Sequence, residues 1–234
     1  MKKLACIDIG NTNIVIGLYN KNNLIKTYRI ETNKLELNKI NFSEFENIAI
    51  SSVVPKITQN LEKYNPFIIN HENSQINLKI DNPEEVGNDR LANIKATIKE
   101  YKLPAIIIDF GSATTYDIIN KNKEFIGGAI APGIDVSAKY LFEKAALLNQ
   151  VSFEFPENVI GKSTTTNLQS GIMFGGIDSI NGMINRIQCE FDETIETLIL
   201  TGGFSKILSP KINHPHTLDP ELTIKGIQAI WNDN

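Results

Sequence analysis

The chain contains an internal repeat, and this repeat constrains its fold more than any other feature. The first copy spans residues 7–25 and the second spans residues 108–126. Each copy has an apolar segment ending in Asp-x-Gly (Asp8 and Asp109), a turn rich in hydroxyl or amide side chains, a second apolar segment, an Asn-rich turn and a third strand. The large distance between the two copies indicates two duplicated domains, because solenoid proteins repeat every 20–50 residues, roughly.

The residue types of the two Asp-x-Gly turns favour the binding of a phosphate. Gly10 and Gly111 allow backbone N–H groups to approach an anion closely. Further donors are available from Asn11, Thr12, Ser112, Thr114 and Thr115. Asp8 and Asp109 would repel a phosphate that they touched, so they imply an intervening cation, typically hydrated Mg²⁺. One such turn could equally be an ordinary hairpin, whereas two equivalent turns facing each other across a cleft favour a phosphate site with a carboxylate on each side.

Composition narrows the range of functions. The 234 residues carry a net charge of −4, and no basic cluster is present, so we expect no nucleic-acid partner. No apolar stretch approaches the length of a membrane span, and Asp8 interrupts the only N-terminal apolar run, so we expect a cytoplasmic protein without a membrane partner. Cys6 and Cys189 are expected to be buried free thiols. His214 and His216 could bind a metal, but without a visible third ligand a solvated loop is the preferred interpretation.

Hydrophobic periodicity predicts an alternating α/β chain. The predicted elements are three antiparallel strands in residues 1–30, a helix candidate at 34–41, a strand at 47–53, a helix from Asn88 that ends before Pro104, a strand from Ala105, a helix capped by Asp135 that extends to Leu148, a glycine-rich helix at about 166–188, a strand at 197–201 and a helix at about 221–231. Strands followed by helices, twice over, indicate two related domains, which we place at residues 1–104 and 105–234.

Three further segments have both a structural and a functional interpretation. Gly87-Asn88-Asp89-Arg90 begins a helix, where Asn88 or Asp89 could serve as a helix cap. Arg90 opposes the helix dipole there, which favours a site for an anionic small molecule. Residues 127–133 could serve packing or line a ligand. Residues 200–205, with Gly202 and Gly203, could be a plain strand–helix turn or a surface for a base or ribose.

Five motifs in this order resemble the type III pantothenate kinases, which belong to the actin-like ATPase superfamily together with sugar and acetate kinases. The motifs are residues 8–12, residues 87–90, residues 109–115, residues 127–133 and residues 201–203. The resemblance covers nearly the whole chain. It implies two duplicated ribonuclease-H-like domains with a nucleotide cleft between them, and a homodimer. It also implies ATP-dependent phosphorylation of pantothenate to 4'-phosphopantothenate, the first step of coenzyme A synthesis.

The resemblance also implies roles for individual residues. Asp89 corresponds to the proposed catalytic base, and pantothenate is held by Gly87, Asn88, Asp89 and Arg90. The ATP-binding positions of the first hairpin are Asp8, Ile9, Gly10, Asn11, Thr12, Asn13, Ile14 and Val15. Asp109 corresponds to the ligand of a monovalent cation, K⁺ or NH₄⁺, and Ser112 contacts ATP, which binds with Mg²⁺. Thr164, aligned to a threonine shortly before the long helix, contacts pantothenate from across the dimer.

The chain departs from the family pattern at two positions. Many members have threonine where Ser112 stands, and they often have tyrosine at the substrate pocket where Ile80 stands. Two other functions remain open at this level: a non-catalytic nucleotide-binding regulator of the same fold, and another small-molecule kinase or polyphosphate phosphatase of the superfamily. The acidic residues Asp8, Asp89 and Asp109, together with Arg90, argue against an inactive enzyme.

Overall fold

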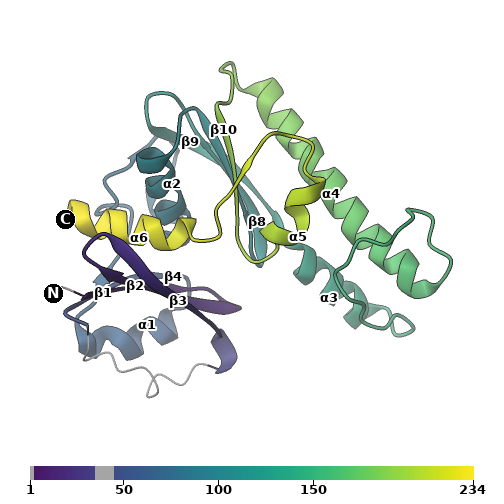
Figure 1. The fold of residues 1–234 in the computed structure, drawn as a ribbon, viewed down its shortest axis with the longest axis horizontal. Helices are drawn as coiled ribbons and strands as arrows, with labels where there is room; N and C mark the ends of the chain where they lie inside the picture. The colour runs from purple at the N-terminus through teal and green to yellow at the C-terminus, as the bar shows by residue number, and fades with distance from the viewer. Residues whose placement is uncertain (1–2, 35–44) are drawn as a thin grey trace. The chain divides into compact units, whose positions relative to one another are not determined.

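The computed structural model of the chain describes residues 3–34 and 45–234 (Figure 1). The helix candidate at 34–41 therefore lies almost entirely outside the described residues. None of the helices within the described ranges is long and apolar enough to cross a membrane.

The first sheet contains the N-terminal repeat copy. Its strands are β1 (Lys3–Ile9), β2 (Asn13–Asn20), β3 (Asn23–Glu31), β4 (Asn47–Ser52) and β5 (Phe67–Ile68). They lie in the order β3-β2-β1-β4-β5. The three strands of the repeat are antiparallel, whereas β4 and β5 continue the sheet in parallel with β1. The three predicted antiparallel strands in residues 1–30 are confirmed.

The second sheet repeats this arrangement. Its strands are β6 (Asn77–Leu78), β7 (Ala105–Phe110), β8 (Ala113–Ile119), β9 (Glu124–Pro132), β10 (Thr197–Thr201) and β11 (Thr217–Leu218). They lie in the order β11-β10-β7-β8-β9-β6, and β10 and β11 are parallel to β7 as β4 and β5 are to β1. Apart from β6, which pairs with the far side of β9, the strand order matches that of the first sheet. The duplication predicted from the sequence repeat is therefore present in the topology.

The helices follow the strands in both halves. They are α1 (Pro55–Leu61), α2 (Asn88–Glu100), α3 (Ile134–Lys144), α4 (Thr164–Glu190), α5 (Ser205–Leu208) and α6 (Leu222–Asp233), with short 3-10 turns at Thr32–Lys34, Glu62–Tyr64, Pro83–Glu85 and Ser209–Lys211. The predicted Asp135 cap is wrong, because the N-cap is Gly133 and Asp135 instead pairs with Lys139 at 3.1 Å. The predicted extension to Leu148 is also wrong, since α3 ends at Lys144.

The chain forms two compact units, each built from separate segments. The first comprises the described parts of Met1–Leu103 with Ile119–Gly127 and Glu221–Asn234, and the second comprises Pro104–Ile118 and Gly128–Pro220. The helix α6 thus belongs to the first unit although it ends the chain. The proposed domains at 1–104 and 105–234 are contiguous in sequence, and that division stays a prediction.

Each unit has its own apolar core. In the first unit, Ala5, Ile7 and Ile9 of β1 pack with α1 on one face of the sheet, and α6 packs against β1 and β4. In the second unit, alternate residues of β7 pack against the apolar side of α4 and against α5. This alternation follows from the two-residue period of a strand. Cys6 is buried, but Cys189 is exposed near the end of α4, so the expected burial of both thiols is wrong for Cys189.

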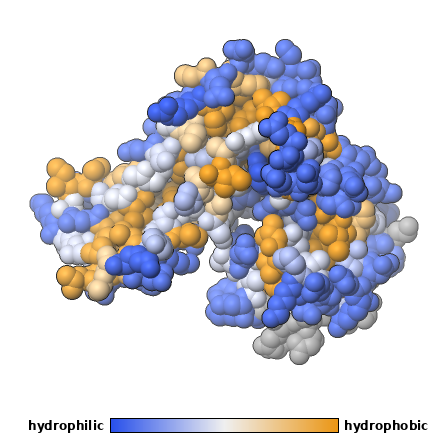
Figure 2. All heavy atoms as spheres, turned by 180° about the vertical axis from the view of Figure 1, so that it is seen from behind, coloured by the Kyte–Doolittle hydropathy of each residue, from blue (hydrophilic) through white to orange (hydrophobic). Residues whose placement is uncertain are grey.

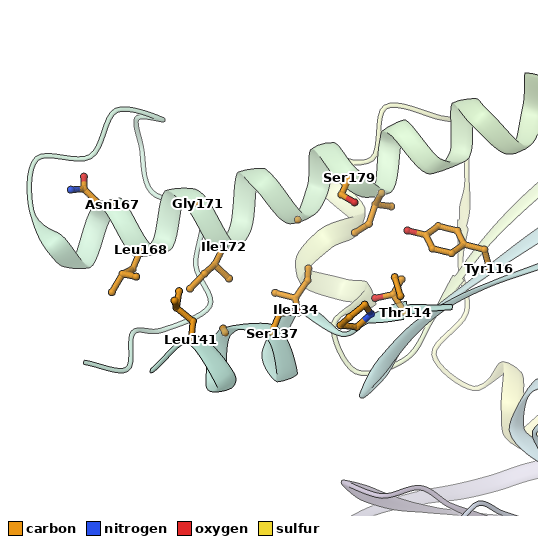
Figure 3. A pocket seen from close by; sticks show the side chains of 15 residues that line it. Thr114, Tyr116, Ile134, Ser137, Leu141, Asn167, Leu168, Gly171, Ile172 and Ser179 are labelled. Carbon is orange, nitrogen blue, oxygen red and sulfur yellow. The ribbon is translucent and has the colours of Figure 1, made fainter. Parts of the chain in front are cut away.

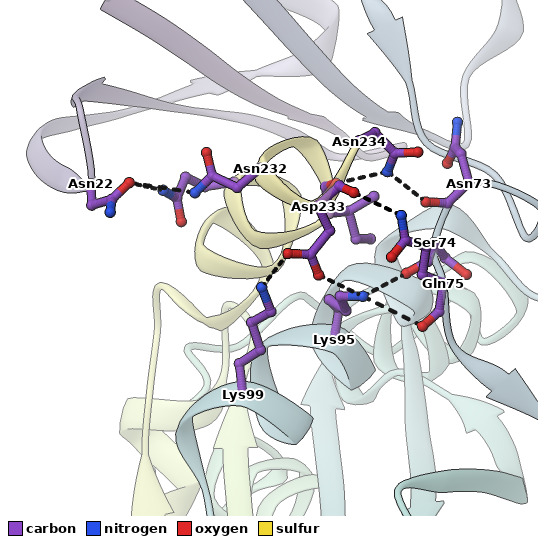
Figure 4. A network of polar contacts seen from close by, with 11 residues as sticks. Asn22, Asn73, Ser74, Gln75, Lys95, Lys99, Asn232, Asp233 and Asn234 are labelled. Carbon is purple, nitrogen blue, oxygen red and sulfur yellow. Dashed lines mark hydrogen bonds and ion pairs between the residues drawn. The ribbon is translucent and has the colours of Figure 1, made fainter.

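A polar network holds the end of α6 against α2 (Figure 4). Lys95, only 5% exposed, pairs with Asp233 Oδ2 at 3.0 Å and donates to the backbone oxygen of Ser74 at 3.0 Å. Lys99 binds the other carboxylate oxygen of Asp233 at 2.5 Å. Burial alone would raise the pKa of the Asp233 carboxyl, but hydrogen bonds from Lys99 and Lys95 lower it below its ordinary value. The buried Lys95 is therefore compensated by a charge and by backbone acceptors.

Candidate active site

The first Asp-x-Gly turn is a tight turn that is held in place by Thr32, a residue just after β3. The Gly10 N–H donates to the backbone oxygen of Asn13 at 3.0 Å and closes the turn between β1 and β2. Thr32, just after β3, donates its N–H to the Thr12 oxygen at 2.9 Å and its hydroxyl to the Gly10 oxygen at 2.7 Å. Asn11 and Thr12 are exposed at the tip. The turn is thus held in one shape while its polar residues face outward.

The residues that flank this turn divide into two groups. Ile9 and Ile14 are buried in the core, with 0% and 1% exposure. Their side chains are unavailable to a nucleotide, so any contact that they make with ATP is through the backbone. The positions that offer side chains to a ligand are Asp8, Asn11, Thr12, Asn13 and Val15, which are partly or fully exposed.

Asp8 is held by a buried hydroxyl on the neighbouring parallel strand. Ser51 is in register with Asp8, is fully buried, and donates its hydroxyl to Asp8 Oδ1 at 3.0 Å. A hydrogen bond is electrostatically stronger in a buried site than in water, so the Ser51 hydroxyl orients the Asp8 carboxylate. Sequence analysis missed Ser51, although its place at the end of a predicted strand beside β1 was a usable signal.

The Gly87–Arg90 motif forms the start of α2, as predicted. Gly87 is the N-cap residue and no side-chain cap is present. The Asp89 carboxylate folds back, and its Oδ1 accepts the Arg90 N–H at 2.8 Å. A Cβ at Gly87 would lie 2.6 Å from that oxygen. The glycine of this motif therefore makes room for the Asp89 carboxylate, which also satisfies one N–H group of the first helical turn.

The same unit brings this helix start next to the first hairpin. The side-chain amide of Asn88 donates to the backbone oxygen of Ser52 at 3.2 Å. Ser52 follows Ser51, the residue that binds Asp8, and the Val53 N–H donates to the Ile9 oxygen at 3.1 Å. The end of β4 thus connects the carboxylate of the first hairpin with the motif that contains Asp89.

Arg90 lies over an aromatic ring that sequence analysis did not identify. Its guanidinium carbon is 5.5 Å from the ring centroid of Phe125, a buried residue of β9 in the same unit. Ile80 lies beside this strand, because its Cγ2 is 4.0 Å from the position that a Cβ of Gly127 would take. Phe125 supports the guanidinium through a cation–π contact, which orients Arg90 without neutralising its charge.

The second hairpin repeats the design with a turn one residue shorter. The Gly111 N–H donates to the Ala113 oxygen at 3.0 Å. Asp109 is in register with Thr201 of β10, which is 1% exposed, as Asp8 is in register with Ser51. Gly202 has a φ of +87°, and a Cβ there would overlap Asp109 Oδ1. Gly202 is therefore required both for its left-handed conformation and for the space that the Asp109 carboxylate occupies.

The residues near this second turn do not share one face. Ser112 is partly exposed, and its backbone oxygen accepts the Gly133 N–H at 3.0 Å. Gly133 therefore packs on the turn, which supports the packing interpretation of residues 127–133 at this position. Thr114 and Thr115 alternate along β8 and point to opposite faces of the sheet, so they cannot both line one phosphate site.

Thr164 is the first residue of α4, whereas the sequence predicted that it lies shortly before this helix. The N-cap is Ser163, whose hydroxyl accepts the Thr166 N–H in a capping box. Thr164 itself is exposed in the second unit. Its hydroxyl is thus available to a partner that approaches this helix end.

Metal ligands are not clustered within the described residues. No group of three or more His, Cys, Asp or Glu side chains there lies close enough together to hold a metal ion. His216 contacts the Ser209 hydroxyl at 2.8 Å and the backbone oxygen of His214 at 2.6 Å. A Mg²⁺ ion that accompanies ATP needs only one or two carboxylates plus phosphate oxygens, and Asp8 fits that requirement.

Comparison with known proteins decides the family. The family model described as type III pantothenate kinase matches residues 4–186. The type III pantothenate kinase of Halalkalibacterium halodurans is 36% identical over 253 residues, covering 99% of both chains. That of Bacillus cytotoxicus is 35% identical over 250 residues, covering 97% of this chain and 95% of the relative.

The chain belongs to the type III pantothenate kinase family.

Solved structures place this family member in the actin-like ATPase fold. A Campylobacter jejuni protein assigned to the Baf family of transcriptional activators has a TM-score of 0.64 and 25% identity, covering 98% of each chain. The activator of 2-hydroxyisocaproyl-CoA dehydratase from Clostridium difficile, with bound ADPNP, has a TM-score of 0.54 and 12% identity, covering 98% of this chain and 93% of that one. The predicted α/β fold with duplicated domains is therefore confirmed.

Proposed function

We propose that this kinase transfers the γ-phosphoryl group of ATP to the primary hydroxyl of pantothenate, forming 4'-phosphopantothenate in the first step of coenzyme A synthesis. The observation that carries the proposal is a pair of hydrogen bonds made by the last two residues of β4, Ser51 and Ser52. Ser51 binds the Asp8 carboxylate and Ser52 binds Asn88, so a phosphate-binding turn and the Gly87–Arg90 motif meet in one unit. A reaction on ATP, with soluble substrates, favours the cytoplasm.

On the nucleotide side, the anchored turn would present backbone N–H groups and the side chains of Asn11 and Thr12 to the phosphates of ATP. Mg²⁺, when bound near Asp8, would neutralise the charge that develops on the transferred group. Ser51 acts through Asp8, because it fixes the direction in which the carboxylate points. Ser112 would contribute its hydroxyl to ATP from the second hairpin, as a threonine does in many family members.

On the acceptor side, Asp89 would accept the proton of the pantothenate hydroxyl as that oxygen attacks phosphorus. Arg90, oriented by Phe125, would hold the acceptor through its hydroxyl or carboxylate oxygens. Phosphoryl transfer has a loose transition state, so positioning and charge neutralisation supply most of the rate, and the base contributes about 10²–10⁴-fold.

A coupled assay of the purified protein with ATP and a panel of acceptors tests this function. The panel contains pantothenate, a hexose, acetate, polyphosphate and no acceptor. We expect ADP release that depends on pantothenate. Turnover with a different acceptor, or hydrolysis of polyphosphate, would assign another reaction of the superfamily. Nucleotide binding without any turnover would favour the non-catalytic regulator.

We also propose that Asp109 binds a monovalent cation, K⁺ or NH₄⁺. A second carboxylate close to ATP phosphates would repel them unless a cation lay between. Replacing K⁺ by Na⁺ or tetramethylammonium at constant ionic strength is expected to depress the rate. Asp109→Asn should weaken this dependence, whereas Asp192→Asn, at an exposed loop residue, should retain it. Equal rates in all three salts would refute the cation site.

We further propose that two copies of the chain form a homodimer through α4. Gly171, Gly175 and Gly182 have no heavy atom within 4 Å of the position of an added Cβ, so the described chain leaves this side of the helix open to close approach. The second unit also exposes large apolar side chains, including Leu147 at 93% and Ile160 at 84% (Figure 2). Apolar side chains exposed to this degree are candidates for burial between subunits.

A mixing experiment tests whether Thr164 serves the site of the partner subunit. One chain carries Asp89→Asn and the other carries Thr164→Val. If each pantothenate site uses both chains, a heterodimer has both lesions in one site and an intact second site. Activity is then expected to recover above either parent after subunit exchange. No recovery, with exchange demonstrated by differently tagged chains, would mean that Thr164 acts within its own chain or outside any site.

A further inference from the structure

A groove of the second unit belongs to a surface that already has a proposed role. The groove lies between α3 and α4, and its lining includes Leu141, Leu168, Gly171 and Ile172 (Figure 3). Gly171 is one of the glycines on the side of α4 that we propose to face a second copy of the chain. The groove is therefore counted with that proposed interface. The side chain to which the structure gives a new role is Asn88, which precedes the proposed base.

Asn88 occupies the first position of α2 without capping this helix. Gly87 is the N-cap residue, and no side-chain cap is present. Asparagine is favoured at the N-cap position, but within a helix it is less favourable than alanine. The formation of α2 therefore does not explain the asparagine at this position.

The Asn88 side chain instead binds a backbone group at the end of β4. Its Nδ2 donates to the backbone oxygen of Ser52 at 3.2 Å. This oxygen points to the same side of β4 as the Ile50 oxygen, because backbone groups two residues apart on a strand point the same way. The Ile50 oxygen accepts the Ile69 N–H at 2.9 Å, but β5 ends before it reaches Ser52. Asn88 thus satisfies an acceptor that the neighbouring strand leaves open.

The end of β4 that Asn88 binds is itself fixed on two sides. The Val53 N–H donates to the backbone oxygen of Ile9 at 3.1 Å, which ties this end to β1. The Ser52 hydroxyl accepts the Val54 N–H at 3.1 Å and the Thr58 hydroxyl at 2.6 Å, which ties it to α1. The acceptor of the α2 contact is therefore held in place by both neighbouring elements.

The contact made by Asn88 constrains where the Asp89 carboxylate lies. Asp89 Oδ1 accepts the Arg90 N–H at 2.8 Å, so the carboxylate moves with the backbone of this turn. Ser51, which lies next to the acceptor of Asn88, holds the Asp8 carboxylate. The Asn88 amide therefore ties the proposed base to the hairpin that is proposed to bind ATP. A misplacement of reacting groups by about 1 Å can lower a rate by about 10²-fold.

We propose that Asn88 is a positioning residue for phosphoryl transfer. By binding the Ser52 oxygen, its side chain fixes the place of the Asp89 carboxylate relative to the Asp8 hairpin. Any contact that pantothenate makes at this position is then through the backbone of Asn88. This inference rests on the proposed function, in which Asp89 is the base and the Asp8 hairpin binds ATP.

Removal of the Asn88 amide is expected to slow the transfer step itself. Asn88→Ala deletes the donor, and Asn88→Asp places a carboxylate oxygen against the Ser52 oxygen. In single turnovers stopped by rapid quenching, both variants should transfer the phosphoryl group at least about 10-fold more slowly than the wild type. Calorimetric titration with pantothenate counts the intact sites, so that rates are compared per site. Asn60→Ala, at an exposed asparagine of α1, is the matched control and should retain the wild-type rate. Wild-type rates in both Asn88 variants would refute the proposal.

The Asp89→Asn background separates positioning from a direct contact with substrate. If Asn88 acts through Asp89, adding Asn88→Ala should slow the Asp89→Asn protein by no more than about 2-fold, because the carboxylate that it positions is already absent. An equal slowing in both backgrounds would mean that the Asn88 side chain acts independently of Asp89, which overturns the inference and leaves Asp89 as the base. A wild-type transfer rate in the Asp89→Asn protein would instead remove the base from the proposed function, and the positioning role would fail with it.

Discussion

Asp89→Asn is expected to lower kcat by about 10²-fold or more while leaving ATP binding largely intact. The substitution removes the carboxylate proposed as the proton acceptor but retains an oxygen at the same place. That oxygen can still accept the Arg90 N–H, the contact that Asp89 Oδ1 makes at 2.8 Å. The start of α2 should therefore persist, and the effect on kcat should report the lost carboxylate rather than a damaged helix.

Three measurements separate these effects. Steady-state kinetics give kcat and KM for pantothenate, fluorescence titration with a nucleotide analogue gives ATP affinity, and thermal unfolding gives stability. Asp192→Asn, at an exposed residue after α4, is the matched control and should behave as the wild type. Wild-type kcat in the Asp89→Asn protein would remove Asp89 from the chemistry. Its role would then be limited to capping the first turn of α2.

Gly226→Ala is expected to lower the free energy of unfolding of the first unit by about 3 kcal/mol. Gly226 is buried in α6, where the helix crosses α2, and an added Cβ would overlap the backbone carbonyl of Ala92. A backbone atom cannot rotate away as a side chain can, so the two helices would have to separate. The gain in helix propensity from glycine to alanine, about 1 kcal/mol, is too small to offset this overlap.

Denaturant unfolding followed by tryptophan fluorescence measures this effect directly, because Trp231 is the single tryptophan and lies in α6. Gln188→Ala is the matched control. Gln188 also lies within a helix, but its side chain is exposed and packs against no other element of the described residues. That variant should be as stable as the wild type to within about 0.5 kcal/mol. Equal stability of the two variants would show that α2 and α6 are not in close contact at Gly226.

Much of the candidate site was accessible from the sequence because its signals are local. Asp8, Gly10 and Asp109 belong to a repeated strand–turn–strand pattern, and such a pattern depends on residues close together in the chain. Gly87–Arg90 was likewise placed at a helix start by the apolar periodicity of the residues that follow it. The cap of α3 was misplaced, because Gly133 and Asp135 offer competing start signals and packing of Gly133 on the second hairpin decides between them.

The sequence by itself determined the duplication, the α/β class and the position of the two Asp-x-Gly turns, since these follow from periodicity and from short-range turn chemistry. Only the tertiary structure decided which distant residues support them. Ser51 reaches Asp8 through the parallel register of β1 and β4, and Phe125 reaches Arg90 through the return of a later strand to the first unit. Both contacts join residues far apart in the chain, and strand register and packing, which bring them together, leave no local pattern in the sequence.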